Sequence, residues 1–259
     1  MKLLIDIGNS RMKWAWSSAE GLIRFGQTTH RNRDFSAALA ELLHGSTPPV
    51  EVRVANVAGP AAGALLTEAV YERFRVRPVF ARSPDSAYGL KSGYRSPGQL
   101  GIDRWLAMCA AWQKLSCPLC VVDAGTAITI DTVMADGAHS GGLILPGIRL
   151  MAAALRQETG DLDRVAGPAL PQDISALPMQ GGALGVDTAG AIQLGATRAI
   201  MALVADCLSR LNAEVDGAKL AITGGDGAWL AGLLGVPAAC YPNLVLEGLA
   251  LEPACYSTD

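Results

Sequence analysis

The sequence has few charged residues, few aromatic residues and no cysteine framework. Of its 259 residues, 17% are charged, 5% are aromatic and half are hydrophobic. So little charge and so much apolar material exclude an intrinsically disordered chain. Six cysteines are too few for a disulfide-stapled small domain. The length allows one large domain or two smaller ones, and each would be large enough to bury a core.

The sequence also lacks an excess of positive charge. It carries 21 Lys and Arg against 24 Asp and Glu, a net charge of -3, distributed as +6 over residues 1–115 and -9 over residues 116–259. An acidic chain has no overall attraction to nucleic acid or anionic membranes, so we predict neither partner. Arg73, Arg75 and Arg77 form a local basic cluster, and their spacing favours the solvated face of a strand.

No segment has the pattern of a secretory signal or of a membrane span. Asp6 interrupts the apolar N-terminus after three apolar residues, which leaves no signal-peptide core. Residues 227–246 form the longest uncharged run, but its glycines and prolines favour a helix, a turn and a buried strand. We therefore predict a cytoplasmic protein.

Cysteine-based metal and redox sites are not expected either. Cys117 and Cys120 are the only close pair, and no second pair completes a set of zinc ligands. A thioredoxin-type pair would follow a strand, whereas this pair precedes one. We interpret the cysteines as buried thiols in a reducing compartment.

Two common nucleotide-binding motifs are missing. The chain contains no Gly-Lys dipeptide, which excludes a P-loop, and no G-x-G-x-x-G lies between a strand and a helix, which excludes a Rossmann fingerprint.

Two similar β-hairpins are instead predicted, over residues 2–16 and 119–133. Each places an Asp-x-Gly sequence at its turn, and the two leading aspartates, Asp6 and Asp123, lie 117 residues apart. Glycine lets backbone N–H groups approach an anion, while the aspartate holds a cation. A single such turn could be an ordinary hairpin connection. Its recurrence in the same strand context favours a pair of turns that hold the phosphates of a nucleotide.

The remaining periodicity predicts an α/β chain in two domains, 1–115 and 116–259. Helices are expected in the second part of residues 28–44 and over 61–74 and 102–115, strands over 50–57, 77–81 and 220–222, and a long loop over 83–101. Gly224 and Gly225 follow the last of these strands and precede a helix. They indicate either a backbone surface that binds a flat ring near a helix N-terminus or an ordinary tight turn.

These segments together resemble the actin-like, sugar-kinase and heat-shock ATPase superfamily. Residues 6–10 match its first phosphate motif, residues 123–127 its second, and residues 223–225 its adenosine motif. The sequence is most similar to the type III pantothenate kinases, also named the Bvg accessory factor family. That closer resemblance rests on the segments GIDR at 101–104, GGLILPG at 141–147 and GVDT at 185–188, the last followed by AIQLG at 191–195.

The resemblance implies a tandem of two ribonuclease-H-like (actin-like ATPase) domains, with mixed sheets flanked by helices and ATP in the interdomain cleft. It implies ATP-dependent phosphorylation of pantothenate to 4'-phosphopantothenate, the first step of coenzyme A biosynthesis. ATP with Mg²⁺ and a monovalent cation, K⁺ or NH₄⁺, are the implied cofactors. A homodimer is implied as well.

The resemblance also implies roles for particular residues. Asp103 is the general base, Asp6 holds Mg²⁺ and Asp123 holds the monovalent cation. The implied ATP-binding residues are Asp6, Ile7, Gly8, Asn9, Ser10, Arg11, Met12, Lys13, Thr126, Gly224 and Gly225. The implied pantothenate-binding residues are Tyr94, Gly101, Ile102, Asp103, Arg104 and Thr188, with Thr188 supplied by the partner subunit.

The chain departs from the family pattern in two places. Ser10 stands where threonine is common, which keeps the hydroxyl, and Asp187 stands where asparagine often precedes the substrate threonine. Residues 184–211 are weakly charged, with apolar residues largely at helical spacing. Such a helix is buried either inside the monomer or between subunits, and the resemblance favours the homodimer.

General chemistry is consistent with these roles, because phosphoryl transfer needs mainly charge neutralisation and a carboxylate that accepts the hydroxyl proton. Each residue also has a plainer interpretation. Asp103 could simply interact favourably with the dipole of its helix, and Lys13 could be an outward-facing strand lysine. Tyr94 could only pack within the loop, and Arg104 could form a surface ion pair. Two other functions stay open at this point: another small-molecule kinase, and a nucleotide-binding regulator without turnover.

Overall fold

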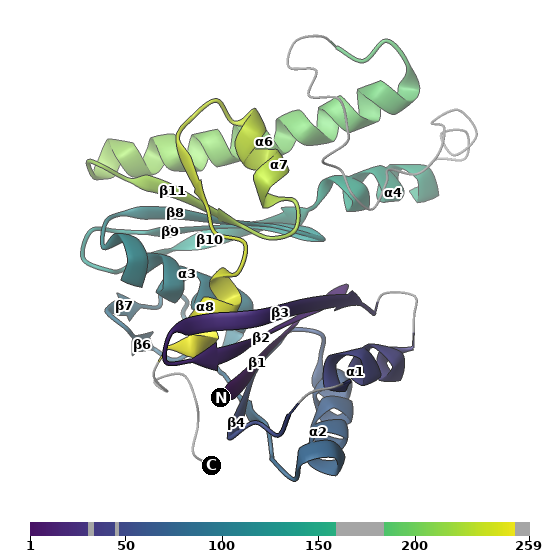
Figure 1. The fold of residues 1–259 in the computed structure, drawn as a ribbon. Coiled ribbons are helices and arrows are strands. Elements are labelled where there is room, and N and C mark those ends of the chain that lie inside the picture. The colour runs from purple at the N-terminus through teal and green to yellow at the C-terminus, as the bar shows by residue number, and fades with distance from the viewer. Residues whose placement is uncertain (31–33, 45–46, 159–183, 252–259) are drawn as a thin grey trace. The chain divides into compact units, whose positions relative to one another are not determined.

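The computed structural model describes residues 1–30, 34–44, 47–158 and 184–251 (Figure 1). Backbone contacts divide the chain into two compact units. Met1–Lys114 and the segment from Asn243 onward form unit 1, and Leu115–Pro242 form unit 2. The expected second domain, 116–259, is therefore corrected at its C-terminal end, because the segment that begins at Asn243 packs within unit 1.

Unit 1 is built on a five-stranded mixed sheet with the order β3-β2-β1-β4-β5. Strand β1 pairs antiparallel with β2 and parallel with β4. The outer strands continue each side, β3 antiparallel to β2 and β5 parallel to β4. The strands are β1 Lys2–Ile7, β2 Arg11–Ser18, β3 Gly21–Thr29, β4 Glu51–Asn56 and β5 Val79–Phe80.

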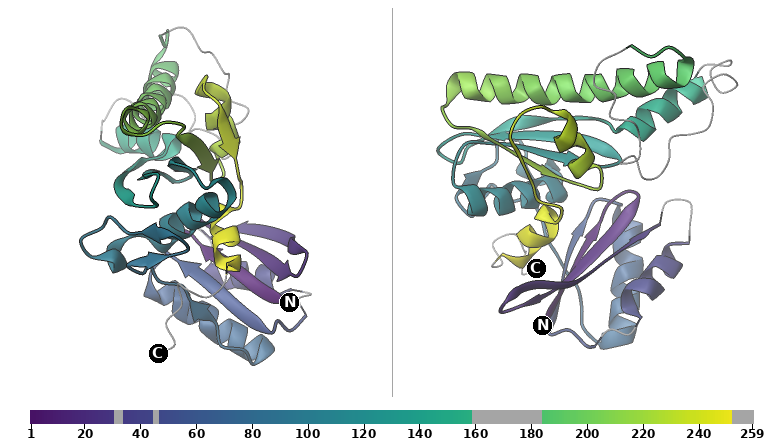
Figure 2. Two further views of the ribbon diagram at one scale, coloured as in Figure 1. Left: turned by 90° about the vertical axis from the view of Figure 1, so that its left-hand side faces the viewer. Right: turned by 45° about the horizontal axis from the view of Figure 1, so that its top comes forward.

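Helices cover both faces of this sheet, since alternate residues of β1 and β4 point to opposite sides. Helices α1 (Phe35–Leu43) and α2 (Pro60–Phe74) form one core cluster with β1 and β4, and Figure 2 shows the two helices together on one side of the sheet. On the other face α8 (Leu244–Ala250) contacts β1 and β4. The rest of unit 1 contains β6 Ser86–Ala87, β7 Leu90–Lys91, a 3₁₀ turn Pro97–Gln99 and α3 Ile102–Leu115.

A buried arginine fixes α8 to unit 1. Arg53 on β4 is 1% exposed and donates to the carbonyl oxygens of Leu249 and Leu251, at 3.1 and 2.6 Å. Its Nε also donates to Glu51 at 2.8 Å. These two carbonyls lie at the C-terminal end of α8, where the helix leaves its last C=O groups without internal partners. Arg53 therefore caps a helix that is nearly 200 residues away in the sequence.

Unit 2 repeats the same sheet, with the order β10-β9-β8-β11-β12 and the same strand directions. Its strands are β8 Leu119–Ala124, β9 Ala127–Val133, β10 His139–Pro146, β11 Lys219–Thr223 and β12 Ala238–Cys240. Its helices are α4 Ile148–Glu158, α6 Thr188–Glu214 and α7 Gly227–Leu233. Apolar residues of α6 and α7 pack on β8, β9 and β11 in one core cluster. The repeated mixed sheet flanked by helices confirms the predicted fold class.

Most predicted elements are present, and one prediction about a local cluster needs correction. Strands β3 and β10 and helix α4 were not predicted. Arg73, Arg75 and Arg77 do not form a strand face, because α2 ends at Phe74 and Arg75 adopts a left-handed backbone conformation with φ of 59°. Their guanidinium groups lie over aromatic rings instead, Arg73 over Phe74 and the other two over Tyr71.

Helix α6 is unusually exposed for its composition. Within the described chain it is the one helix that is long and apolar enough to cross a membrane by length and composition, and only 22% of its apolar window is buried. The run 227–246, in contrast, folds as α7, β12 and the start of α8. The predicted helix and strand are present, but no residue of β12 is buried and helix α8 was not predicted.

Candidate active site

The first phosphate turn, defined as residues 7–11, connects β1 to β2. It is closed by a hydrogen bond from the Gly8 N–H to the Arg11 carbonyl, at 3.0 Å. Asp6, directly before the turn, pairs in register with Lys13. Residues directly opposite in an antiparallel pair share a face of the sheet. The predicted cation ligand and the predicted phosphate-binding lysine therefore lie on the same face.

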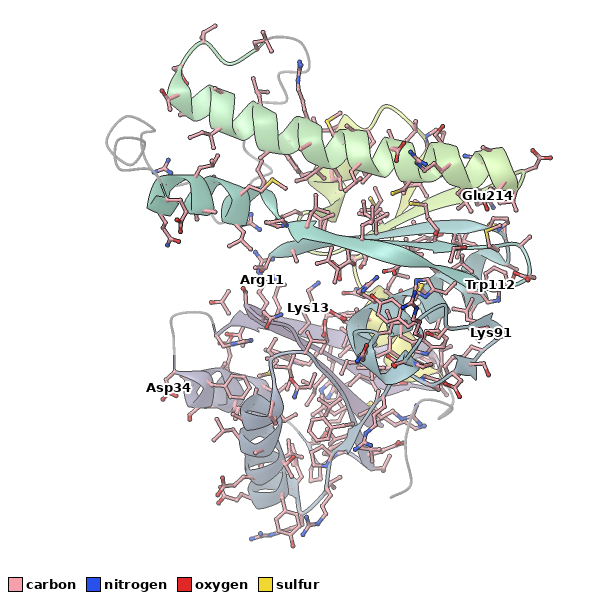
Figure 3. The ribbon with its side chains drawn as sticks, turned by 180° about the vertical axis from the view of Figure 1, so that it is seen from behind. Arg11, Lys13, Asp34, Lys91, Trp112 and Glu214 are labelled. Carbon is pink, nitrogen blue, oxygen red and sulfur yellow. The ribbon has the colours of Figure 1, made fainter. Side chains whose placement is uncertain are left out.

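The side chains of the turn and of the next two residues divide into two groups. Ile7 and Met12 are fully buried in the core, so only their main chain can contact a nucleotide. Asn9 is exposed, and Ser10, Arg11 and Lys13 are half-buried. Figure 3 shows Arg11 and Lys13 close together at the turn end of β2, as expected for residues two apart on a strand. These two cations are placed to neutralise an anion bound at the turn.

The fold of unit 1 also brings together the residues of the predicted substrate-binding segment at the start of α3. Asp103 lies in the first turn of α3, where its Oδ1 accepts the Arg104 N–H at 2.8 Å. Gly101 gives this carboxylate room, because a Cβ there would come within 2.6 Å of Asp103 Oδ1. Ile102 is buried and supports the start of the helix.

Arg104 and Tyr94 form a specific contact between α3 and the preceding loop. Arg104 Nη1 donates to the Tyr94 hydroxyl at 2.7 Å, and the guanidinium carbon lies 5.6 Å from the ring centroid. Arg104 is only 5% exposed, so the plainer interpretation as a surface pair is wrong. A buried guanidinium beside Asp103 gives this segment a fixed cation for an anionic substrate.

In unit 2 the second phosphate motif lies directly against the adenosine motif. Gly224 has a φ of +92°, and a Cβ there would collide with Asp123 Oδ1 and the Ala124 carbonyl. The Asp226 N–H donates to that same carbonyl at 2.9 Å. Gly225 is exposed at the tip of the turn. Glycine is thus required at 224 so that the backbones of the two motifs can meet.

Two parts of this region were not predicted as site residues. The Gly147 N–H donates to the Thr126 carbonyl at 2.9 Å, which brings the start of α4 to the second phosphate motif. Arg149, in the first turn of α4, forms a 2.6 Å ion pair with Asp226, which is 5% exposed. Gly147 ends the 141–147 motif and Arg149 follows it by two residues, and that adjacency was the available signal in the sequence.

Thr188 begins the long helix α6. The preceding Asp187 is its N-cap, and its carboxylate accepts the Gly190 N–H at 2.7 Å. Asparagine and aspartate cap helices about equally well, so the departure from the family pattern at 187 keeps the local structure. Thr188 belongs to unit 2, whereas Asp103 belongs to unit 1.

Asp6 and Asp123 are single carboxylates. Each suits a cation that takes most of its other ligands from the oxygens of a bound nucleotide. No group of three or more His, Cys, Asp or Glu side chains that could hold a metal was found in the described part of the chain. Mg²⁺ in phosphate-transferring sites typically takes one or two carboxylates and completes its shell with phosphates and water. Asp6 fits that pattern. Asp123 Oδ1 and the Ala124 carbonyl border the space that a side chain at Gly224 would fill, and oxygen ligands of this kind suit a hard cation.

The cysteines of the described chain are not part of this chemistry. Cys109, Cys117, Cys120, Cys207 and Cys240 are free thiols. Burial, and then the neighbouring Cys207 and Asp131, raise the pKa of Cys120 to about 12. The Cys120 thiol is therefore protonated and unreactive at neutral pH.

The family model for type III pantothenate kinases matches residues 2–210. A type III pantothenate kinase of Halorhodospira halophila is 39% identical over 256 residues, which cover 96% of this chain and 96% of the relative. One of Nitrosococcus oceani is 33% identical over 256 residues, covering 96% and 92%. The chain belongs to the type III pantothenate kinase family. The resemblance drawn from its motifs is thereby confirmed.

Solved structures agree with this family in fold. A Campylobacter jejuni protein assigned to the Baf family of transcriptional activators superposes with a TM-score of 0.60 at 24% identity, covering 95% of this chain and 94% of its own. A ROK family glucokinase of Streptomyces griseus, solved with glucose and AMPPNP, gives a TM-score of 0.50 at 13% identity, covering 96% and 97%. This chain therefore shares its overall fold with both solved structures.

Proposed function

We propose that this chain phosphorylates pantothenate at the expense of ATP and so forms 4'-phosphopantothenate, the first step of coenzyme A biosynthesis. The observation that carries the proposal is the recurrence of one sheet in both units, each with an Asp-x-Gly turn at the same hairpin, in a chain of this family. Each such turn would supply main-chain donors and a carboxylate to nucleotide phosphates.

The proposal assigns proton transfer to Asp103. Asp103 is half-buried in the first turn of α3, where its carboxylate accepts the Arg104 N–H, and a positioned carboxylate can take the proton of a substrate hydroxyl. Arg104 and Tyr94, already joined by a hydrogen bond, would orient the pantothenate carboxylate, together with the main chain of Gly101 and Ile102. Arg11 and Lys13 would neutralise the phosphates as charge develops in the transition state.

The cation assignments are part of the same proposal. Asp6 would hold Mg²⁺, and Asp123 would hold K⁺ or NH₄⁺ next to the Gly224 main chain. When bound, these cations reduce the repulsion between the phosphates and the incoming hydroxyl oxygen. The exposed Gly225 and the adjoining Gly224 would support the adenosine, and Thr126 would donate to a phosphate.

A homodimer is proposed on the exposed apolar surface of unit 2. Large apolar side chains are exposed on β10, on α4 and before α6: Leu143, Ile144, Leu155, Leu184 and Val186. A surface of this kind on a water-exposed protein favours an interface. The proposed arrangement lets Thr188 complete the pantothenate site of the partner subunit. We also propose a cytoplasmic location, which the free thiols of the described chain support.

The test is an assay of ADP release by the purified full chain with ATP, Mg²⁺ and pantothenate, while K⁺, NH₄⁺ and Na⁺ are varied in turn. We expect ADP release to require pantothenate and mass spectrometry to identify 4'-phosphopantothenate. Release with sugars but not with pantothenate would indicate another small-molecule kinase. Nucleotide binding without release to any acceptor would indicate a regulator.

A further inference from the structure

We propose that His30 is a positioning residue for the first phosphate turn, and that it holds the main chain of this turn in the form that receives phosphate. His30 follows β3 and matches no motif of the sequence analysis. The inference rests on the proposed function, because it assigns His30 a role toward the phosphates of ATP.

Two hydrogen bonds join His30 to the turn. Its ring Nε2 donates to the Gly8 carbonyl at 2.8 Å, and its backbone N–H donates to the Ser10 carbonyl at 3.1 Å. The second bond continues the β2–β3 pairing, in which Arg11 lies opposite Thr29. The first bond reaches beyond the strands into the turn itself. The imidazole therefore restrains a peptide group that the sheet leaves unrestrained.

The bond from His30 to the Gly8 carbonyl also sets the direction in which the Asn9 N–H points. A carbonyl oxygen only accepts, so Nε2 must carry the proton. The chain has no cis peptide bonds among its described residues, and in a trans peptide the C=O and the following N–H point in opposite directions. Holding the Gly8 carbonyl toward His30 therefore turns the Asn9 N–H away from His30. Among the described residues this N–H has no hydrogen-bond partner, and Asn9 is exposed.

The imidazole ring is itself held by a neighbouring aromatic side chain. Phe35, the first residue of α1, meets the imidazole edge-on, with ring centroids 5.2 Å apart and planes at 82°. The imidazole is half-buried. A donor fixed by its own neighbours costs less ordering when ligand binds, which is how supporting residues improve a binding site.

The experiment compares three variants of the full chain. His30→Phe keeps a ring next to Phe35 but has no donor, His30→Gln places an amide N–H near the position of Nε2, and Phe35→Leu keeps the donor but loses its ring contact. Binding of ADP and of ATP with Mg²⁺ is measured by calorimetry without acceptor. KM and kcat are then measured separately for ATP and for pantothenate.

We expect His30→Phe to weaken ATP binding and raise the KM for ATP about 3- to 10-fold, as the loss of one hydrogen bond should. The KM for pantothenate should stay unchanged. His30→Gln should restore ATP binding to within about twofold of the wild type, and Phe35→Leu should have a smaller effect than His30→Phe. Wild-type ATP affinity in His30→Phe would overturn the proposal, as would equal impairment of His30→Gln and His30→Phe.

A second measurement needs no variant. The ¹⁵N chemical shifts of the His30 ring in the wild type should show a protonated Nε2 and should change when nucleotide is added. An unprotonated Nε2, or a ring signal that nucleotide does not change, would overturn the proposal. Because nucleotide binding is measured without acceptor, a failure of the pantothenate assay leaves this test intact, and the two proposals can fail separately.

Discussion

At the scale of single residues, the proposed site uses carboxylates whose surroundings differ. Asp103 is half-buried on a helix and accepts the N–H of its neighbour, whereas Asp123 lies against the main chain of a second motif. The motifs predicted where these residues lie along the chain. They could not predict that Arg104 is buried against Tyr94, because that contact depends on how the loop 83–101 folds back on α3.

Asp103→Asn should keep the fold and lower turnover by roughly 10²- to 10⁴-fold, the usual effect of removing a positioned general base. The amide keeps the shape and can still accept the Arg104 N–H, but it cannot take a proton. Steady-state kinetics and thermal unfolding check both parts. Asp136→Asn is the matched control, because Asp136 also accepts a nearby backbone N–H and lies outside the site. A near-normal rate in Asp103→Asn would assign the base to another residue.

Asp123→Asn should weaken both the activation by K⁺ and the use of ATP, because one carboxylate fewer balances the cation beside the phosphates. Activity is measured against K⁺ concentration at fixed ATP, and then against ATP at saturating K⁺. An unchanged K⁺ dependence in this variant would show that Asp123 does not hold the monovalent cation.

Gly224→Ala should destabilise unit 2 by about 1–3 kcal/mol and weaken ATP binding, since it forces a strained φ and a collision with Asp123 and Ala124. Gly217→Ala separates the two causes. Gly217 also has a positive φ, of 75°, but a Cβ there would meet no atom within 4 Å. Urea denaturation and calorimetry of both variants give the comparison. Equal losses of stability would show that close approach at Gly224 has no effect of its own.

At the scale of elements, hydrophobic periodicity predicted the hairpins, α3 and the long helix, because in each the apolar residues follow the period of the element. Strand β3 was missed because its residues are mostly exposed and glycines interrupt the alternation. The assignment of α8 to unit 1 was not predictable from local pattern. It depends on Arg53, a contact nearly 200 residues away in the sequence.

Arg53→Met should lower the free energy of unfolding by about 2–4 kcal/mol, because it leaves the carbonyls of Leu249 and Leu251 without this donor and leaves Glu51 with Lys2 as its one remaining ion-pair partner in the described chain. Denaturant unfolding measures the loss. Arg210→Met is the control, since it breaks an exposed pair with Asp206 and should cause no measurable change. A loss no larger in Arg53→Met than in this control would mean that α8 is held by apolar packing alone.

The same variant should change the dependence of stability on pH. Burial opposes ionisation of Glu51, but the hydrogen bonds and charges of Arg53 and Lys2 outweigh it and lower the pKa of this carboxyl from its ordinary 4.5. A lowered folded-state pKa adds stability that is present above the unfolded value and is lost as the pH falls through the folded value. Arg53→Met should therefore lose less stability than the wild type on acidification below about pH 4.5.

At the scale of the whole molecule, the proposed dimer makes each substrate site depend on two chains. We expect Asp103→Asn and Thr188→Val chains to be nearly inactive alone and to regain activity when mixed, because a mixed dimer contains one site with both native residues. Subunit exchange is followed by fluorescence energy transfer and turnover by ADP release. If subunits exchange but activity does not recover, each chain binds its own substrate. If sedimentation shows a monomer, the proposed dimer is wrong.

The return of α8 to unit 1 also decides the order in which the protein can be completed during synthesis. Unit 2 is continuous in sequence, so it can close as soon as residue 242 has left the ribosome. The face of β1 and β4 that α8 covers stays open until Leu244–Ala250 have emerged. A nascent chain that stops short of Asn243 carries a finished second unit and an unfinished first one, with an apolar sheet face and the Arg53 guanidinium exposed to chaperones and proteases.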